Sequence, residues 1–264
     1  NHYGDPLFMP EVLRAFGVDV QELDGWREWG MGDFTKIWGV AVHHTGANNT
    51  SAEYIARNPG LENGLSSQIH LSRTPPYTAT ICGAGVAWHL GRGSYPGLPT
   101  DNANPYMIGI EPQSDGVSPW PDNMLDTYHR IVAALLWYLG LDSSRCIAHW
   151  EYSYYAQGKW DPGAGDSVPG HMMDMDEFRA NVQKYIDNPP FGKGELMGVL
   201  DARFKSRVPG STWEGTLRDF IINTNAHSYM GMDAAQRNGD KLDKLIELTE
   251  KQNDLLQNLI NRIR

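Results

Sequence analysis

The sequence has little cysteine and no long hydrophobic run. Its 264 residues include only two cysteines, Cys82 and Cys146, which do not form a Cys-x-x-Cys pair. Two cysteines are too few for a disulfide scaffold, so we interpret them as small buried hydrophobic residues, with a single bridge as the alternative. No stretch approaches the roughly 18 continuous apolar residues of a transmembrane helix, and the first residues lack a signal-peptide pattern. The sequence therefore predicts no membrane partner.

Positive charge is also scarce. Lysine and arginine total 22 against 32 aspartates and glutamates, which gives a formal net charge of −10 at pH 7. Such a chain repels polyphosphates and offers no basic stripe, so nucleic acid is not expected as a partner. The hydrophobic fraction of 41% and the charged fraction of 20% are typical of globular proteins. Nine tryptophans and twelve tyrosines are abundant, and such rings often line grooves that bind sugars or peptides.

Two regions are predicted along the chain. Pro189-Pro190, followed by a glycine-rich stretch, predicts a boundary between a catalytic domain at 1–187, with an N-terminal extension, and a small all-helical C-terminal region at 188–264. Between 241 and 264, apolar residues recur on one face of a predicted helix. This helix is interpreted either as a self-association helix that forms a homo-oligomer or as a terminal helix folded onto its own domain.

The hydrophobic patterns in the catalytic region predict an α/β fold, with a mixed central β-sheet flanked by helices. The run at 37–42 is rich in strand formers and predicts a buried strand that ends at His43. The Thr50-Ser51-Ala52-Glu53 capping pattern predicts the start of a helix. The other predicted elements are a strand pair at 66–72 and 78–84, a strand at 106–110, a long helix between Pro121 and Gly140, a loop at 159–163, and a helix between Asp174 and Asn188.

Three residues are candidate ligands for a metal ion. His43 follows the first predicted strand, His149 follows a second apolar segment, and Asp161 comes twelve positions later. Zinc hydrolases use three protein ligands and leave the fourth position to water, and two histidines with a carboxylate fit that rule. Successive side chains on a strand face opposite sides, so His43 and His44 cannot both enter one site without a bulge. We interpret His44 as a supporting residue, with a register shifted by one as the alternative.

Five motifs occur in an order that resembles a known family. They are Val42-His43-His44-Thr45, Ala87-Trp88-His89-Leu90-Gly91, Ile108-Gly109-Ile110-Glu111, Ala148-His149-Trp150 and Lys159-Trp160-Asp161-Pro162-Gly163. Over roughly residues 35–187, the series resembles the zinc N-acetylmuramoyl-L-alanine amidases, a family that includes phage lysins and peptidoglycan recognition proteins. The segments Gly25-Trp26-Arg27 and Gly32-Asp33-Phe34 further resemble endolysins of phages that infect actinobacteria. This narrower resemblance implies synthesis in the host cytoplasm before lysis and action on the bacterial cell wall.

The resemblance implies roles for individual residues. His43, His149 and Asp161 match the zinc ligands, and the zinc would activate water for attack on the amide between muramic acid and L-alanine in peptidoglycan. Lys159 matches a lysine that stabilises the oxyanion, with an ordinary solvated lysine as the alternative. Glu111 matches a glutamate that orients or deprotonates the water, with a salt-bridged strand terminus as the alternative.

The general base is less firmly assigned than the ligands. Some family members carry a tyrosine on the strand where this chain has Ser67-Gln68. Its absence shifts the predicted role of base toward Glu111.

Aromatic and imidazole side chains near these motifs are candidates for substrate binding. For each of them the alternative is packing against the core. The candidates are His44, Trp88, His89, Trp150 and Tyr152.

Two other classes of function compete with the zinc amidase. The first is a peptidoglycan-binding module on the same scaffold that does not cut, which is disfavoured because all three ligands are present. The second is a cysteine peptidase, which requires a cysteine and histidine in a polar cleft. The apolar surroundings of Cys82 and Cys146 argue against it. Cell-wall binding and oligomerisation both remain open for residues 188–264.

Overall fold

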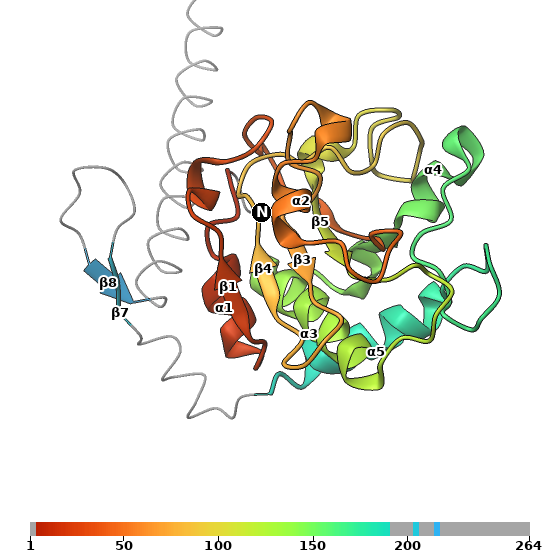
Figure 1. The fold of residues 1–264 in the computed structure, drawn as a ribbon. Helices are drawn as coiled ribbons and strands as arrows, with labels where there is room; N and C mark the ends of the chain where they lie inside the picture. The colour runs from red at the N-terminus through yellow and green to blue at the C-terminus, as the bar shows by residue number, and fades with distance from the viewer. Residues whose placement is uncertain (1–3, 191–202, 206–213, 217–264) are drawn as a thin grey trace, which may run out of the picture. The chain divides into compact units, whose positions relative to one another are not determined.

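The computed structural model describes residues 4–190, 203–205 and 214–216 (Figure 1). The chain divides into two compact units, residues 1–192 and 193–264. The first unit contains all the predicted chemistry.

Two short strands are the described elements of the second unit. They are β7 (Arg203–Lys205) and β8 (Glu214–Thr216), which pair antiparallel. The prediction of an entirely helical C-terminal region is therefore wrong at these residues. Strands of three residues are too short for a recognisable sequence pattern, and they are defined by their pairing with each other. The predicted helix at 241–264 lies outside the described residues.

A mixed six-stranded sheet forms the centre of the first unit, with strand order β1-β4-β3-β5-β2-β6. Strands β3, β5, β2 and β6 are mutually parallel, whereas β4 is antiparallel to β3 and parallel to β1. This confirms the predicted α/β class with a mixed sheet. The strands are β1 (Val20–Glu22), β2 (Gly39–Val42), β3 (Ile69–Leu71), β4 (Ala79–Ile81), β5 (Met107–Pro112) and β6 (Cys146–Ala148).

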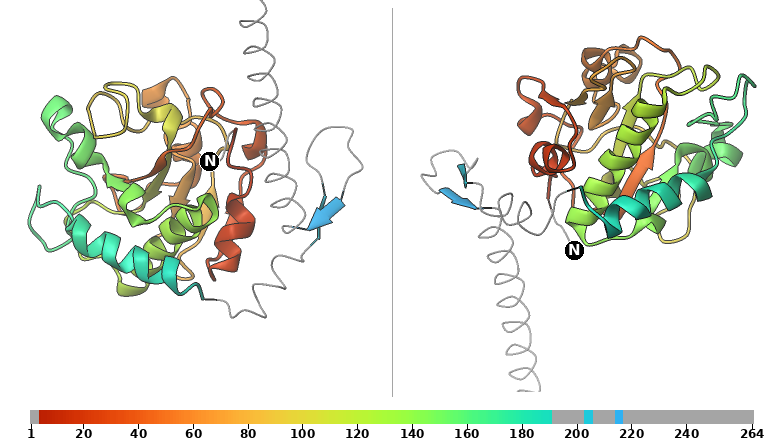
Figure 2. Two further views of the ribbon diagram at one scale, coloured as in Figure 1. Left: turned by 180° about the vertical axis from the view of Figure 1, so that it is seen from behind. Right: turned by 90° about the horizontal axis from the view of Figure 1, so that it is seen from below.

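Within the described residues of the first unit, five α-helices flank the sheet. Helix α3 packs against both α1 and α5, and these helices can be followed from behind and from below in Figure 2. Helix α2 contacts β3. The helices are α1 (Met9–Ala15), α2 (Ala52–Ala56), α3 (Asp122–Leu139), α4 (His149–Gln157) and α5 (Met175–Asp187).

Helix α3 confirms the long helix predicted between Pro121 and Gly140 and also supports the site. Its apolar positions at helical spacing are buried, and Gly140 ends it in the left-handed conformation that glycine adopts readily. Tyr128 on the buried face reaches the end of β2. Its hydroxyl accepts a hydrogen bond from the His43 backbone N–H at 2.9 Å and donates one to the His43 carbonyl at 3.2 Å. Helix α3 therefore fixes the backbone at the end of β2.

Several boundaries follow the predictions closely. The strand predicted at 37–42 is β2, and the strand pair predicted at 66–72 and 78–84 is the antiparallel hairpin β3–β4. The helix opened by Asp174 is α5, with the Asp174 carboxylate accepting from the backbone N–H groups of residues 176 and 177. Both cysteines are buried and free. None of the helices within the described part of the chain has the length and apolar character to span a bilayer.

Other boundaries differ from the predictions. Helix α2 is capped by Ser51, whose hydroxyl accepts from the Tyr54 backbone N–H, so the predicted cap at Thr50 was one residue early. The N-terminal extension forms α1 and the edge strand β1, which no pattern had indicated. β1 is only three residues long, and its place in the sheet depends on pairing with β4, far along the chain.

Helix α4 occupies the segment just before the predicted loop at 159–163, where the sequence had predicted no helix. Its polar and apolar residues do not separate onto opposite faces, so the period of 3.6 residues is not visible in the sequence. Glu151 stabilises its first turn by accepting a hydrogen bond from the Ala148 backbone N–H at 2.8 Å. The same carboxylate forms an ion pair with Arg179 of α5 at 2.9 Å. Tertiary contacts therefore hold this helix.

One buried histidine in α3 makes stability depend on pH. Burial lowers the pKa of His129 from its ordinary 6.5 to about 4. As the pH falls, the unfolded chain takes up this proton first, so the stabilisation is complete above pH 6.5 and is lost as the pH falls toward 4. This difference in pKa between the folded and unfolded chain corresponds to about 3 kcal/mol in the free energy of unfolding. Urea unfolding measured near neutral pH and again near pH 4 gives the free energy of unfolding at each pH. Between these two pH values wild type should lose about 3 kcal/mol more of this free energy than His129→Phe does. Equal losses would contradict this effect of burial.

Candidate active site

The predicted ligands come together from the end of β2, the start of α4 and the loop after α4. β2 and β6 are parallel neighbours with Val42 paired to Ala148, so their C-terminal ends meet at one edge of the sheet. His43 directly follows β2, and His149 is the first residue of α4. Asp161 lies on the loop that returns after α4, where its carbonyl accepts a hydrogen bond from the Trp150 backbone N–H. The three side chains therefore converge from separate segments.

The ligand atoms of these residues form a small triangle. His43 Nδ1 lies 3.1 Å from His149 Nδ1 and 3.0 Å from Asp161 Oδ2. His149 Nδ1 lies 2.9 Å from the same carboxylate oxygen. Both histidines are almost fully buried, with exposed fractions of 1% and 5%. Burial lowers the pKa of His43 to about 4, so its imidazole is neutral and able to bind a cation at neutral pH.

The outer nitrogens of both rings are already used. His149 Nε2 lies 3.1 Å from the Leu90 carbonyl, and His43 Nε2 lies 2.9 Å from His89 Nδ1. A carbonyl only accepts hydrogen bonds, so His149 donates from Nε2, and the neutral ring with that proton has its lone pair at Nδ1. Lone pairs and a carboxylate oxygen converging at this spacing repel one another unless a cation lies among them.

The donor set fits zinc. Two imidazole nitrogens and one carboxylate oxygen are the ligands of many catalytic zinc sites, which leave a fourth position to water or substrate. A tetrahedral ion at the usual bond lengths separates its ligands by about 3.3 Å, close to the spacing observed here. Of the metal-binding residue types in the described part of the chain, His43, His149 and Asp161 form a group compact enough to hold an ion.

Glu111 is a buried carboxyl beside this group. It lies in β5, whose register places it next to His43, because Val42 pairs with Ile110 one position earlier. Within the described residues its Oε2 is buried and has no hydrogen-bond partner. Burial raises the pKa of Glu111 well above its usual value, and the negative charge of Asp161 raises it further. The carboxyl therefore keeps a proton to higher pH than an ordinary glutamate does.

Lys159 supplies the positive charge near this carboxyl. Its side chain is exposed, and its charge opposes the rise in the pKa of Glu111. The same charge contributes to the lowered pKa of His43, after burial. A fixed cation at the edge of a buried group of ligands can stabilise negative charge that develops on a substrate.

The family comparison agrees with this geometry. Residues 33–164 match the sequence pattern of the family described as N-acetylmuramoyl-L-alanine amidase. The chain belongs to this family. No curated protein matches the chain significantly.

Several solved structures are similar to this family member. The catalytic domain of XlyA is 18% identical, with a TM-score of 0.41, covering 62% of this chain and 99% of that one. The amidase LysC from Clostridium intestinale URNW is 14% identical, with a TM-score of 0.42, covering 62% and 97%. The Staphylococcus aureus hydrolase AmiA is 13% identical, with a TM-score of 0.42, covering 64% and 84%.

In the amidase domain, His44 supports the Asp161 loop. Its Nδ1 accepts a hydrogen bond from the Gly163 backbone N–H at 2.9 Å, and its ring meets Trp160 edge-on. His43 and His44 therefore face different partners, as the alternation of side chains along a strand predicts. The predicted contact of His44 with substrate stays a prediction.

The candidate substrate residues of the amidase domain occupy different environments. Trp88 is 41% exposed and is available at the surface. His89 is buried beneath His43 instead of lining a surface. Tyr152 also lies in the core, where it packs with Ala41 and Leu90, and its hydroxyl donates to the Pro99 carbonyl at 2.8 Å. Tyr152 therefore faces the inside of the domain from α4. The sequence analysis had it as a candidate for substrate binding, but the structure does not place it at the surface.

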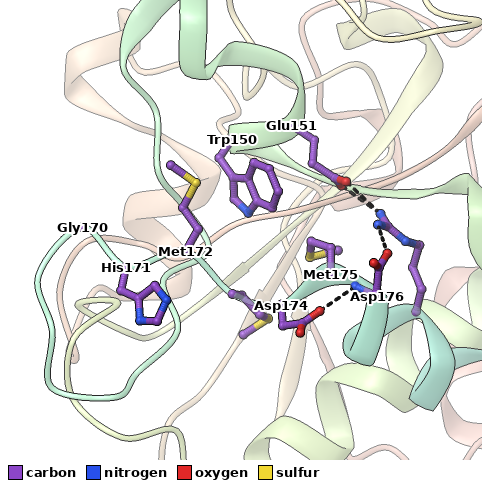
Figure 3. Close-up of a pocket in the computed structure, with 10 residues that line it drawn as sticks. Trp150, Glu151, Gly170, His171, Met172, Asp174, Met175 and Asp176 are labelled. Atoms are coloured by element: carbon purple, nitrogen blue, oxygen red, sulfur yellow. Dashed lines mark hydrogen bonds and ion pairs between the residues drawn. The ribbon is translucent and has the colours of Figure 1, made fainter.

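Trp150 lines a cavity of about 580 Å³ next to the amidase site (Figure 3). Methionines of the 172–175 segment and the start of α5 also line this cavity. Arg179, which forms ion pairs with Glu151 and Asp176, is another lining residue. The indole Nε1 of Trp150 is buried and has no partner among the described residues. The structure thus places Trp150 where the sequence predicted a binding role, and that role stays a prediction.

Sequence reasoning missed the residues that support the ligands. Tyr128 was recognised only as an apolar position on the long helix, although its hydroxyl fixes the backbone of His43. The carbonyls of Leu90 and Met107 accept hydrogen bonds from His149 and His89. Every residue has a backbone carbonyl, so the sequence cannot predict these contacts. Only the Ala-Trp-His motif pointed to this region.

Proposed function

We propose that this chain hydrolyses the amide bond between N-acetylmuramic acid and L-alanine in peptidoglycan, with zinc held by His43, His149 and Asp161. The observation that carries the proposal is the convergence of two imidazole nitrogens and a carboxylate oxygen within 3.1 Å of one another. Membership of the N-acetylmuramoyl-L-alanine amidase family supports the choice of bond.

The chemistry divides between the ion and the chain. When bound, zinc supplies Lewis acidity that polarises the amide carbonyl and makes water acidic enough to attack near neutral pH. Glu111 takes the proton of the attacking water and delivers it to the leaving amine of L-alanine. Lys159 stabilises the negative charge that develops on the carbonyl oxygen. His44 holds the loop that carries Asp161, which keeps the carboxylate in place.

The biological setting is a further part of the proposal. The segments at 25–27 and 32–34, together with the amidase motifs, support a bacteriophage endolysin that is made in the host cytoplasm and acts on the cell wall during lysis. Cell-wall binding or self-association through residues 188–264 stays a prediction, because residues 241–264, where the helix was predicted, lie outside the described residues.

A digest of purified peptidoglycan tests the proposed reaction. We expect new L-alanine amino termini and no new reducing ends, because an amide and not a glycosidic bond is cut. A chelator should abolish the release, and added zinc should restore it. Reducing ends alone would indicate a glycosidase, and indifference to chelator would remove the metal from the proposal. Binding to the wall without release would indicate the non-catalytic module.

A further inference from the structure

Two consecutive residues contact both metal-binding histidines from outside. His89 Nδ1 lies 2.9 Å from His43 Nε2, and the carbonyl of Leu90 lies 3.1 Å from His149 Nε2. Both contacts are to the nitrogen that faces away from Asp161. One short segment therefore contacts the Nε2 side of both imidazole rings.

The hydrogen bonds of this segment determine where each proton lies. His89 Nε2 lies 3.1 Å from the Met107 carbonyl, which only accepts, so His89 donates there. Its Nδ1 is then an acceptor and receives the Nε2–H of His43. This leaves His43 Nδ1 with its lone pair directed at Asp161 and His149. The Leu90 carbonyl imposes the same tautomer on His149 directly.

The segment is itself held in place by Asn104. The side-chain oxygen of Asn104 accepts from the backbone N–H of His89 at 3.1 Å and from that of Leu90 at 2.9 Å. The hydroxyl of Ser153 donates to the Leu90 carbonyl at 2.6 Å. Asn104 lies in a short 3-10 turn, Asn104–Tyr106, just before β5. None of its hydrogen bonds is to His43, His149 or Asp161, so any effect of Asn104 on the metal must pass through the segment.

We propose that the His89–Leu90 segment, anchored by Asn104, is a positioning element that sets the tautomer and direction of both metal-binding histidines. The inference rests on the metal site of the proposed function. It replaces the expectation that His89 contacts the peptide, because the His89 ring is only 7% exposed and both of its nitrogens are already bonded. Groups that orient ligating histidines change metal affinity by about 10–100-fold.

Zinc affinity of three variants tests the proposal. His89→Phe keeps a ring of similar size but neither accepts nor donates, so the zinc Kd should rise about 10–100-fold. Asn104→Leu removes the anchor and should raise the Kd in the same direction. Asn104→Asp keeps an acceptor for both backbone N–H groups and should bind zinc close to wild type. Competition with a chromophoric chelator gives the Kd, and the visible absorption of the cobalt-substituted proteins reports ligand geometry.

A matched control separates positioning from general loss of structure. His129→Phe replaces another buried histidine, in α3, that contacts none of the ligands, and its zinc Kd should equal that of wild type. If His89→Phe does not fold, the two Asn104 variants still test the inference. Asn104→Asp keeps the acceptor for the two backbone N–H groups and Asn104→Leu removes it, so only Asn104→Leu should weaken zinc binding. A zinc Kd within about twofold of wild type for both His89→Phe and Asn104→Leu would overturn the inference, since orienting groups have larger effects. A wild-type protein that binds no zinc would instead overturn the proposed function.

Discussion

Replacing Asp161 with alanine is expected to lower the rate of amide hydrolysis by at least about a thousandfold, because the proposed zinc site would lose one of its three protein ligands. Asp161 is the single anionic residue of the proposed ligand set, and its Oδ2 lies within 3.0 Å of both imidazole Nδ1 atoms. Zinc content should fall together with activity. Release of L-alanine amino termini and metal analysis of the dialysed protein measure the two effects.

The control for Asp161→Ala lies on the same stretch of chain. Asp166 is exposed and pairs with His171, away from the ligands. Asp166→Ala should keep both zinc and activity. If Asp161→Ala retained a full equivalent of zinc and more than about a tenth of the wild-type rate, the carboxylate would not be a ligand.

Replacing Glu111 with glutamine is expected to lower the rate by about 10²–10⁴-fold while leaving zinc affinity unchanged. Glutamine has nearly the same shape but cannot take up or release a proton. The buried Glu111 carboxyl, whose pKa is raised by burial and by the Asp161 charge, is suited to that transfer. Hydrolysis at saturating zinc and the zinc Kd of both proteins should be measured together.

A second glutamate provides the comparison for Glu111→Gln. Glu53 on α2 is exposed, and Glu53→Gln should hydrolyse peptidoglycan at the wild-type rate. If Glu111→Gln kept more than about a tenth of the activity, Glu111 would be a structural strand terminus, and the search for the base would move elsewhere. If the substitution weakened zinc binding instead, Glu111 would act through the ligands.

The elements with strong local patterns were predictable. The apolar spacing of α3 between Pro121 and Gly140 is a property of that segment alone, and the helix has the expected bounds. Helix α4 and strand β1 were not predictable, because neither has a clear period. Their hydrogen bonds and ion pairs connect distant parts of the chain, as between Glu151 and Arg179.

The sequence by itself determined which residue types are available and in what order, and the motif order identified His43, His149, Asp161, Glu111 and Lys159 as candidates. It also determined, through alternation along β2, that His43 and His44 face different ways. Only the tertiary structure decided what lies behind the ligands. His89 is separated from His43 by 46 positions and Leu90 from His149 by 59, so their contacts exist only when β2, β5 and α4 meet. A side chain near a site can face the substrate or support a ligand, and only long-range packing decides between the two.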